Sequence, residues 1–247
     1  MTNWSELNHA YGSADDLPAI LDALSPDPNA PSWGELCSRV CHQGTVYSAS
    51  APVLPRLLAL VRAYTGADRV SPLQLAGAIA NSQDRSKGFD LEPYRGDIEE
   101  LASLARETLA RRDLSRIDFI YLLHAMSALE GDSLWGDPQF GVGFGLADGE
   151  FGGECPHCDT GLQIVIGEHG FFVTDEEWGN RAQTPRNAVV PAEAISLRGV
   201  GARLHRLAHE ANQAQVADWL RHVFGHANCP ACEKPFAVEE AIARTAA

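Results

Sequence analysis

Four of the six cysteines in the chain lie in two turns of the same pattern, Cys155-Pro-His-Cys158 and Cys229-Pro-Ala-Cys232. A C-P-x-C turn, or knuckle, points two thiolates inward, and two knuckles together supply the four ligands of a tetrahedral structural zinc site. The 70 residues between the knuckles exceed the usual spacing in a zinc ribbon, so they predict an insertion between its halves. The sequence therefore predicts one structural Zn²⁺ bound by Cys155, Cys158, Cys229 and Cys232.

Other uses of these four cysteines fit the sequence less well. Two disulfides are disfavoured in a reducing cytoplasm. Gly152, Gly153 and Pro156 indicate a turn, whereas a thioredoxin-type C-x-x-C motif opens a helix after a strand. Iron binding or redox use remains the alternative. Because four thiolates fill a tetrahedral zinc ion, no position is left for the water that catalytic zinc requires.

The other two cysteines, Cys37 and Cys41, are four residues apart within a helical pattern over residues 32–42. This spacing places both on one helix face. They could form a second metal or redox pair, or they could be small apolar residues of the core. Because free cysteine is among the most buried residue types, we expect core positions.

A group of titratable residues in the first 50 positions is the candidate for catalysis. If the first two helical repeats stack, the group could carry out acid–base chemistry or bind a metal. The alternative is helix capping, since aspartates suit a helix N-terminus and a histidine suits a C-terminus. The residues are His9, Asp15, Asp16, His42 and Tyr47.

Further histidines have a spacing that suits metal ligands on a helix. His205 and His209 are four residues apart, but no acid lies between them as in H-E-x-x-H. His222 and His226 repeat the four-residue step, and we expect both pairs to lie on solvated helix faces. His226 could replace a thiolate at the second knuckle, and His157 within the first knuckle is expected to point outward.

The elements that must position these residues begin with six predicted helices, joined by short turns. Leu17-Pro-Ala-Ile-Leu recurs as Leu54-Pro-Arg-Leu-Leu after 37 residues, and Pro93 follows Pro55 after 38. Paired helices at a period near 40 are typical of HEAT- or armadillo-like solenoids. The predicted helices span residues 15–24, 32–42, 51–64, 71–82, 96–112 and 114–130, the last of them centrally buried.

The sequence changes character after this helical domain, which we place at residues 1–132. Residues 133–153 form a connector rich in glycine and aromatics, whose rings we expect to be packed. Residues 154–247 form a zinc-ribbon-like domain with a β-hairpin at 162–166 and 170–174 and a long inserted helix at 203–224. The predicted fold is thus mainly α, and α+β overall.

Charge and hydropathy exclude several functional classes. The 33 acidic residues exceed the 19 basic ones, for a net charge of −14, and both halves of the chain are acidic. A duplex binder needs Lys and Arg to neutralise phosphates, so a nucleic-acid partner is not expected. A local patch from Arg198, Arg203, Arg206 and Arg221 is the exception. No apolar run of 18 residues and no signal peptide is visible, which predicts a cytoplasmic protein without a membrane partner.

Three segments carry a family resemblance: His9-Ala-Tyr-Gly-Ser-Ala-Asp-Asp-Leu-Pro18, His42-Gln-Gly-Thr-Val-Tyr47 and Ala51-Pro-Val-Leu-Pro55. They are similar to a family of uncharacterised bacterial HEAT-repeat-like proteins, over about the first 60 residues. Some members carry a segment like Glu154-Cys-Pro-His-Cys158 followed by a β-hairpin. The resemblance implies an α-solenoid and a protein-interaction role. It implies no reaction and no catalytic residues, and the loop His42-Gln-Gly-Thr45 has no agreed chemistry.

These observations predict a non-enzymatic protein-interaction module with a structural zinc site and a protein partner on the solenoid face. One alternative is an immunity or antitoxin-like protein that neutralises a basic toxin, because an acidic surface attracts a basic partner. Another is a metal-dependent enzyme that uses the region of His9, Asp15 and His42.

Overall fold

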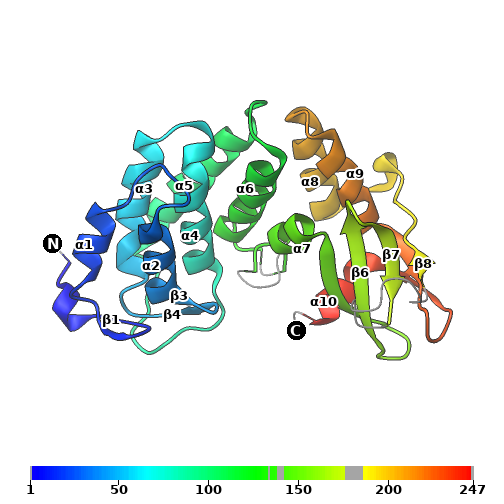
Figure 1. The fold of residues 1–247 in the computed structure, drawn as a ribbon, viewed down its shortest axis with the longest axis horizontal. Helices are drawn as coiled ribbons and strands as arrows, with labels where there is room; N and C mark the ends of the chain where they lie inside the picture. Colours follow the sequence, from blue (N-terminus) through cyan, green and yellow to red (C-terminus); the bar gives the residue numbers. More distant parts are fainter. Residues whose placement is uncertain (1, 133, 138–141, 176–185, 246–247) are drawn as a thin grey trace. The chain divides into compact units, whose positions relative to one another are not determined.

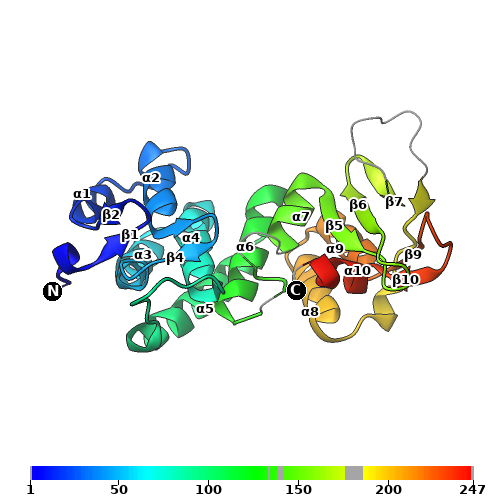
Figure 2. The same ribbon diagram turned by 90° about the horizontal axis from the view of Figure 1, so that it is seen from below.

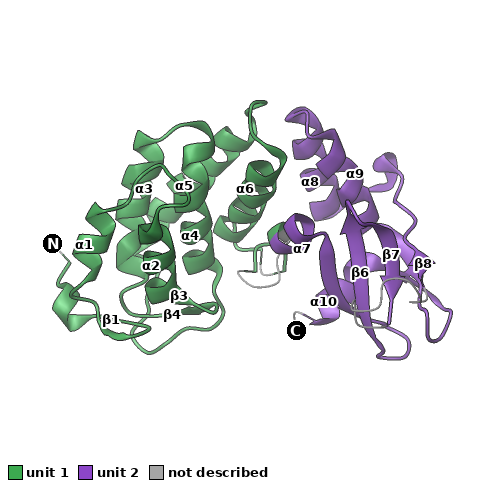
Figure 3. Ribbon diagram, in the orientation of Figure 1, with its two compact units in different colours: residues 1–143 green, residues 144–247 purple. Residues whose placement is uncertain are grey.

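The computed structural model describes residues 2–132, 134–137, 142–175 and 186–245 (Figure 1). The chain divides into two compact units, an N-terminal unit of residues 1–143 and a C-terminal unit of residues 144–247 (Figure 3). The described part holds ten α-helices and several small antiparallel sheets, which confirms the mixed α+β class. The division falls inside the segment that we predict as a connector, 133–153.

The six predicted helices of the N-terminal unit all have counterparts. Proline lies in the first turn of the first three helices, where its missing N–H costs nothing. The sixth begins at a side-chain cap, since Ser115 Oγ accepts from the Asp118 N–H. The helices are α1 (Leu17–Asp22), α2 (Pro31–Val40), α3 (Leu54–Ala63), α4 (Val70–Asn81), α5 (Arg95–Leu109) and α6 (Arg116–Leu129).

These helices pack in consecutive pairs, α1 with α2, α3 with α4, and α5 with α6. Each pair also packs on the next, through α3 with α5, α2 with α4, and α4 with α6. Two ion pairs join residues 38 positions apart: Arg62 with Glu100 at 2.6 Å and Arg69 with Glu107 at 2.9 Å. That separation equals the spacing of Pro55 and Pro93, so residues one sequence repeat apart are neighbours in space.

Two short β-hairpins precede the helices. The first pairs β1 (Asn8–His9) with β2 (Gly12–Ser13), and the second pairs β3 (Cys41–His42) with β4 (Thr45–Val46). The predicted helix over 32–42 therefore ends two residues early, at Val40. Gln43 and Gly44 both have positive φ, 50° and 83°, as a two-residue type I′ turn requires.

The core of the N-terminal unit is centred on α6. Its residues from Phe119 to Leu129 are buried except for the half-buried Tyr121, which confirms the predicted central position. On α4, a Cβ at Gly77 would lie 3.0 Å from the Ala128 Cβ and 3.1 Å from the Ala125 carbonyl oxygen. Glycine at this position therefore lets α4 and α6 approach closely.

The C-terminal unit contains a four-stranded antiparallel sheet in the order β5-β6-β7-β8, with α10 packed on its edge strand β5 (Figure 2). β6 and β7 form the predicted hairpin. The strands are β5 (Glu150–Glu154), β6 (Gly161–Gly167), β7 (Gly170–Thr174), β8 (Asn187–Ala188), β9 (His226–Asn228) and β10 (Pro235–Ala237). The remaining helices are α7 (Val142–Asp148), α8 (Gly199–Glu210), α9 (Ala214–Val223) and α10 (Val238–Thr245). Short 3₁₀ helices span Trp4–Glu6, Ala51–Val53, Gly66–Arg69, Glu92–Tyr94 and Ala194–Ser196.

The single long helix predicted over 203–224 is wrong. The chain reverses between α8 and α9, which pack against each other. Asn212 at the break has φ 61°, a left-handed conformation that asparagine tolerates better than most residues. Apolar residues at helical spacing on both sides conceal this break, because each helix buries its own apolar face.

The glycine-rich segment 133–153 is more ordered than the term connector implies, since it contributes α7 and β5. A Cβ at Gly145 on α7 would overlap the ring of Phe151 on β5, which explains the interleaved glycines and aromatics. Trp135 and Phe151 are buried as predicted, whereas Phe144 is 40% exposed. Phe140 lies outside the described residues.

Candidate metal centre

Each knuckle is the turn of an antiparallel hairpin. The first joins β5 to β6 and the second joins β9 to β10. In both, the N–H of the first cysteine donates to the carbonyl five residues later: Cys155 to Thr160 at 2.9 Å and Cys229 to Lys234 at 3.0 Å. The two turns therefore present their sulfurs from equivalent backbone positions.

The residue after each second cysteine completes the turn. The Asp159 N–H donates to the Cys155 carbonyl at 3.0 Å, and the Glu233 N–H donates to the Cys229 carbonyl at 2.9 Å. Both residues have positive φ, 56° and 61°. A left-handed residue lets the chain turn back toward its own strand, and side chains other than glycine accept this conformation at a small cost in free energy.

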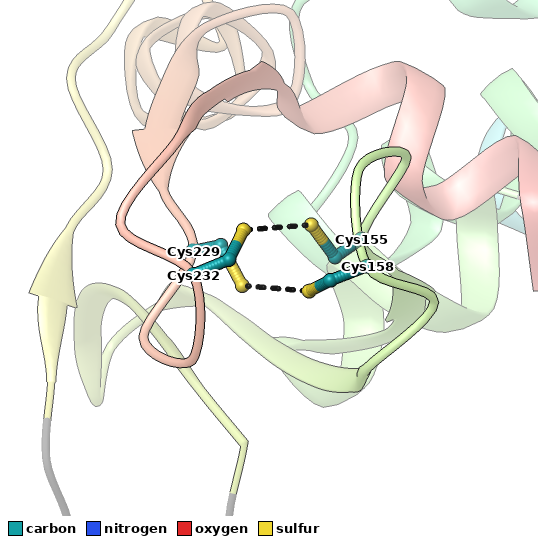
Figure 4. Close-up of side chains that lie close together, drawn as sticks. All are labelled: Cys155, Cys158, Cys229 and Cys232. Atoms are coloured by element: carbon teal, nitrogen blue, oxygen red, sulfur yellow. Dashed lines mark hydrogen bonds between the residues drawn. The ribbon is translucent and has the colours of Figure 1, made fainter.

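The four sulfurs converge between the two hairpins (Figure 4). Cys155 Sγ lies 3.9 Å from Cys232 Sγ, Cys158 Sγ lies 3.8 Å from Cys229 Sγ, and all four fall within 4.8 Å of one another. With Zn–S bonds of about 2.3 Å, a tetrahedral site places its sulfurs about 3.8 Å apart. The separations fit four ligands around one ion and are far too long for disulfide bonds.

The two knuckles expose their cysteines in the same way. Cys155 and Cys229, the first of each pair, are fully buried, whereas Cys158 is exposed and Cys232 is half-buried. Burial raises the pKa of Cys229 to about 12, while the Thr160 hydroxyl, 3.3 Å from Cys158 Sγ, helps lower the pKa of Cys158 to about 6. A divalent cation between the sulfurs would favour the thiolate at every one of them.

Charged side chains brace the first knuckle from outside. Arg244 on α10 lies 2.6 Å from Glu154, directly before the knuckle, and 2.7 Å from Asp159, directly after it. His157 is exposed as expected, but its ring also lies 2.9 Å from the carbonyl oxygen of Pro235. The metal-ligating group found among the described residues consists of the four cysteines alone, so His226 is not part of it.

The remaining cysteine pair is divided between surface and interior. Cys41 begins β3 and is buried, whereas Cys37 on α2 is exposed. Burial raises the pKa of Cys41 to about 12, so this thiol stays protonated and unreactive at neutral pH. The core prediction is confirmed for Cys41 and wrong for Cys37.

The predicted catalytic group is only partly assembled. His9 Nδ1 accepts the Tyr11 N–H at 3.0 Å, so Nε2 carries the ring proton and donates it to Asp16 at 3.0 Å. His42 Nδ1 lies 3.3 Å from the Tyr11 hydroxyl. Asp15 is exposed and accepts a bond from the neighbouring Ser13 hydroxyl instead.

The remaining members of this region play other parts. The backbone N–H of Tyr47 donates to the Ser50 hydroxyl. Arg39 Nε donates to Asp16 at 2.8 Å, a contact that nothing in the local sequence indicated. Desolvation raises the pKa of Asp16, but the bonds from Arg39 and His9 outweigh it and hold this pKa below its ordinary value of 3.8.

The lowered pKa of Asp16 predicts a pH-dependent contribution to stability. Asp16→Asn should cost about 1 kcal/mol of unfolding free energy at pH 7, a modest figure because the side chain is 46% exposed. The ionised carboxylate stabilises the fold above its unfolded pKa, and that contribution disappears as the pH falls through the lowered folded value. Urea unfolding of both proteins at pH 7 and near pH 3 measures it. A gap that stays constant between these pH values would contradict the assignment.

The histidines of the C-terminal unit lie in different environments. His209 and His226 are exposed, as predicted. His205 is half-buried, and desolvation, with His209 and Arg221 nearby, lowers its pKa. His222 is buried, contrary to the prediction of a solvated face, and stacks on the Phe171 ring at 3.8 Å.

Comparisons with family models, curated proteins and solved structures give no match. The functional argument therefore rests on the geometry of this chain. No helix in the described part of the chain is long and apolar enough to cross a membrane.

Proposed function

We propose that the chain is a non-enzymatic protein-interaction module whose C-terminal unit is stabilised by one structural Zn²⁺. The observation that carries the proposal is the convergence of four cysteine sulfurs within 4.8 Å from two equivalent hairpin turns. A donor set of four thiolates suits zinc and leaves no position for a reacting water. The ion would hold together two hairpins that lie far apart in the sequence.

Iron is the alternative occupant of such a site, because thiolates also bind iron. Elemental analysis of the purified full chain distinguishes the two metals, and we expect about one zinc per chain and a colourless protein. Stoichiometric iron with the visible absorbance of an iron–thiolate centre would replace the structural role with electron transfer. A chain purified without any metal, and unable to bind added Zn²⁺, would contradict the metal site itself.

The interaction role is supported by the arrangement of the N-terminal unit. Its consecutive helix pairs, joined by ion pairs at a 38-residue separation, are compatible with a HEAT-like solenoid. Such stacks act by presenting an extended face to another protein. We propose that a protein partner binds on that face.

Charge favours a basic partner, as an immunity or antitoxin-like role would require. Residues 1–143 carry 19 acidic and 11 basic side chains. Several of the arginines are engaged in ion pairs with carboxylates, Arg39, Arg62 and Arg106 among them, which leaves an excess of acidic groups. A Zn²⁺ with four thiolates would add a further net charge of about −2. Complementary charge of this kind accelerates association with a basic protein.

The other candidate roles have less support. Both ring nitrogens of the buried His9 are engaged, so neither is available to take a proton from a substrate. In the predicted arginine patch, Arg198 donates to the carbonyls of Ile195 and Leu197, and Arg221 donates to that of Ala192. Arginines engaged with backbone carbonyls are less suited to phosphate contacts.

Affinity capture with the full chain as bait tests the interaction role. We expect a basic protein to be retained and its binding to weaken as the salt concentration rises, because salt screens charge attraction. A matched bait in which Asp97 and Glu99 on α5 are replaced by lysine controls for nonspecific adsorption. Recovery of only acidic or neutral partners, or binding that does not respond to salt, would contradict the basic-partner proposal.

A further inference from the structure

The two knuckles match in backbone but differ at one side chain. Both have the sequence C-P-x-C, and both are closed by equivalent hydrogen bonds across the hairpin. The third position is His157 in the first knuckle and Ala231 in the second. The two hairpins therefore provide an internal comparison, in which only one turn carries a side chain capable of a directed contact.

The imidazole of His157 reaches from its own knuckle to the other hairpin. Its Nε2 lies 2.9 Å from the carbonyl oxygen of Pro235, 78 residues later in the chain. A carbonyl oxygen only accepts, so Nε2 carries the proton and donates it. Pro235 begins β10, three residues after the ligand Cys232, so the bond ends close to the second pair of sulfurs.

His157 also contacts the ligand set of its own knuckle. Its backbone N–H points to Cys155 Sγ at 3.4 Å. One residue thus bonds a ligand sulfur through its main chain and the opposite hairpin through its side chain. Arg244 braces the same knuckle, but it does so from α10, through Glu154 and Asp159.

A contact between the knuckles matters because the two ligand pairs come from distant parts of the sequence. Any ion that binds all four sulfurs must find the hairpins aligned, or the binding free energy is reduced by the cost of aligning them. Hydrogen bonds outside the ligand set commonly change metal affinity by about 10- to 100-fold. The His157–Pro235 bond is placed to align the second hairpin with the first.

We propose that His157 is a positioning residue of the metal centre: its ring holds the second knuckle against the first and raises metal affinity without ligating the ion. This inference rests on the proposed zinc site, and it adds a role for a side chain outside the four ligands. It also explains why one knuckle suffices to carry the histidine, since a single bond between the hairpins fixes both.

The test compares metal affinity in the full chain and its variants by competition of Zn²⁺ with a chromogenic chelator. His157→Ala should weaken binding about 10-fold, because the four thiolates remain but their alignment is lost. His157→Gln should restore most of the affinity, since its terminal amide extends about as far as Nε2 and donates to the same carbonyl. The Co²⁺ absorption spectrum should keep the pattern of four thiolates in every variant.

A matched control is His226→Ala, which removes an exposed histidine on β9, three residues before Cys229. Its affinity should equal that of the unmodified chain, and circular dichroism should show each variant folded. Four outcomes would overturn the inference. They are equal affinities for His157→Ala and the unmodified chain, failure of glutamine to restore binding, a spectral change that indicates a lost nitrogen ligand, and an equal loss in His226→Ala.

The proposed zinc site fails in a different way from this inference. If the unmodified chain binds neither Zn²⁺ nor Co²⁺, the site and the inference are both contradicted. If it binds one ion with a four-thiolate spectrum and His157→Ala binds equally well, the site stands and only the role of His157 is rejected.

Discussion

Cys229→Ser removes the metal from the chain and unfolds the C-terminal unit. Cys229 Sγ is fully buried and faces Cys158 Sγ at 3.8 Å, so the substitution deletes one ligand and leaves a hydroxyl inside the cluster. Metal binding at a structural zinc site contributes on the order of 10 kcal/mol to folding, most of which depends on a complete ligand set. Metal content by elemental analysis should fall from one ion per chain to near zero. Limited proteolysis should then cleave within residues 144–247.

The matched control for this experiment is Cys37→Ser. Cys37 is an exposed cysteine on α2, in the other compact unit and outside the cluster. It should leave metal content and protease resistance unchanged, which separates the loss of a ligand from a general effect of removing a thiol. A Cys229→Ser protein with full metal content and full resistance would contradict the shared four-cysteine site. Cys155→Ser should repeat the result, because that sulfur is equally buried.

Phe119→Ala should cost about 3–5 kcal/mol of unfolding free energy, the largest effect that we expect in the N-terminal unit. Phe119 is among the largest fully buried side chains of the chain and lies on α6, which packs against both α4 and α5. Removing its ring leaves a cavity that closely packed helices fill only in part. Urea unfolding followed by circular dichroism measures the loss as a lower midpoint of the N-terminal transition.

Ile117→Ala is the control on the same helix, because Ile117 is 41% exposed and its truncation removes little buried surface. It should change the unfolding free energy by less than about 1 kcal/mol. Equal losses for the two variants would contradict the placement of α6 at the centre of the core. Metal content should stay at one ion per chain in both variants, because all four sulfurs belong to the other compact unit.

The metal ligands could be predicted from sequence because their chemistry is local. A C-P-x-C turn fixes the relation between its two sulfurs within four residues, and pairing the knuckles required only that both occur. The helices around Leu17 and Leu54 were predictable for the same reason, since proline in a first turn and apolar spacing act over one or two turns. Helix ends were harder, and α2 ended at Val40 because a tight hairpin followed.

The rest depends on contacts between distant residues. Asn212 interrupts a run of helical spacing that looks continuous, and only the packing of α8 on α9 shows that the chain reverses there. The pairing of Asp16 with Arg39 joins residues 23 positions apart. The bond from His157 to Pro235 joins residues 78 positions apart. No local pattern distinguishes these side chains from exposed polar residues, and no homologous structure supplied the missing distances.

The ion pairs at 38-residue separation have a consequence for how such a chain could lengthen. Arg62 and Glu100 come from equivalent helices of successive pairs, and so do the elements that hold Arg69 and Glu107 close together. A tandem duplication of one helix pair would therefore bring its own charged partner for the copy before it, in register. New modules could be added at the level of the gene without inventing new contacts, and the length of the array would be free to vary.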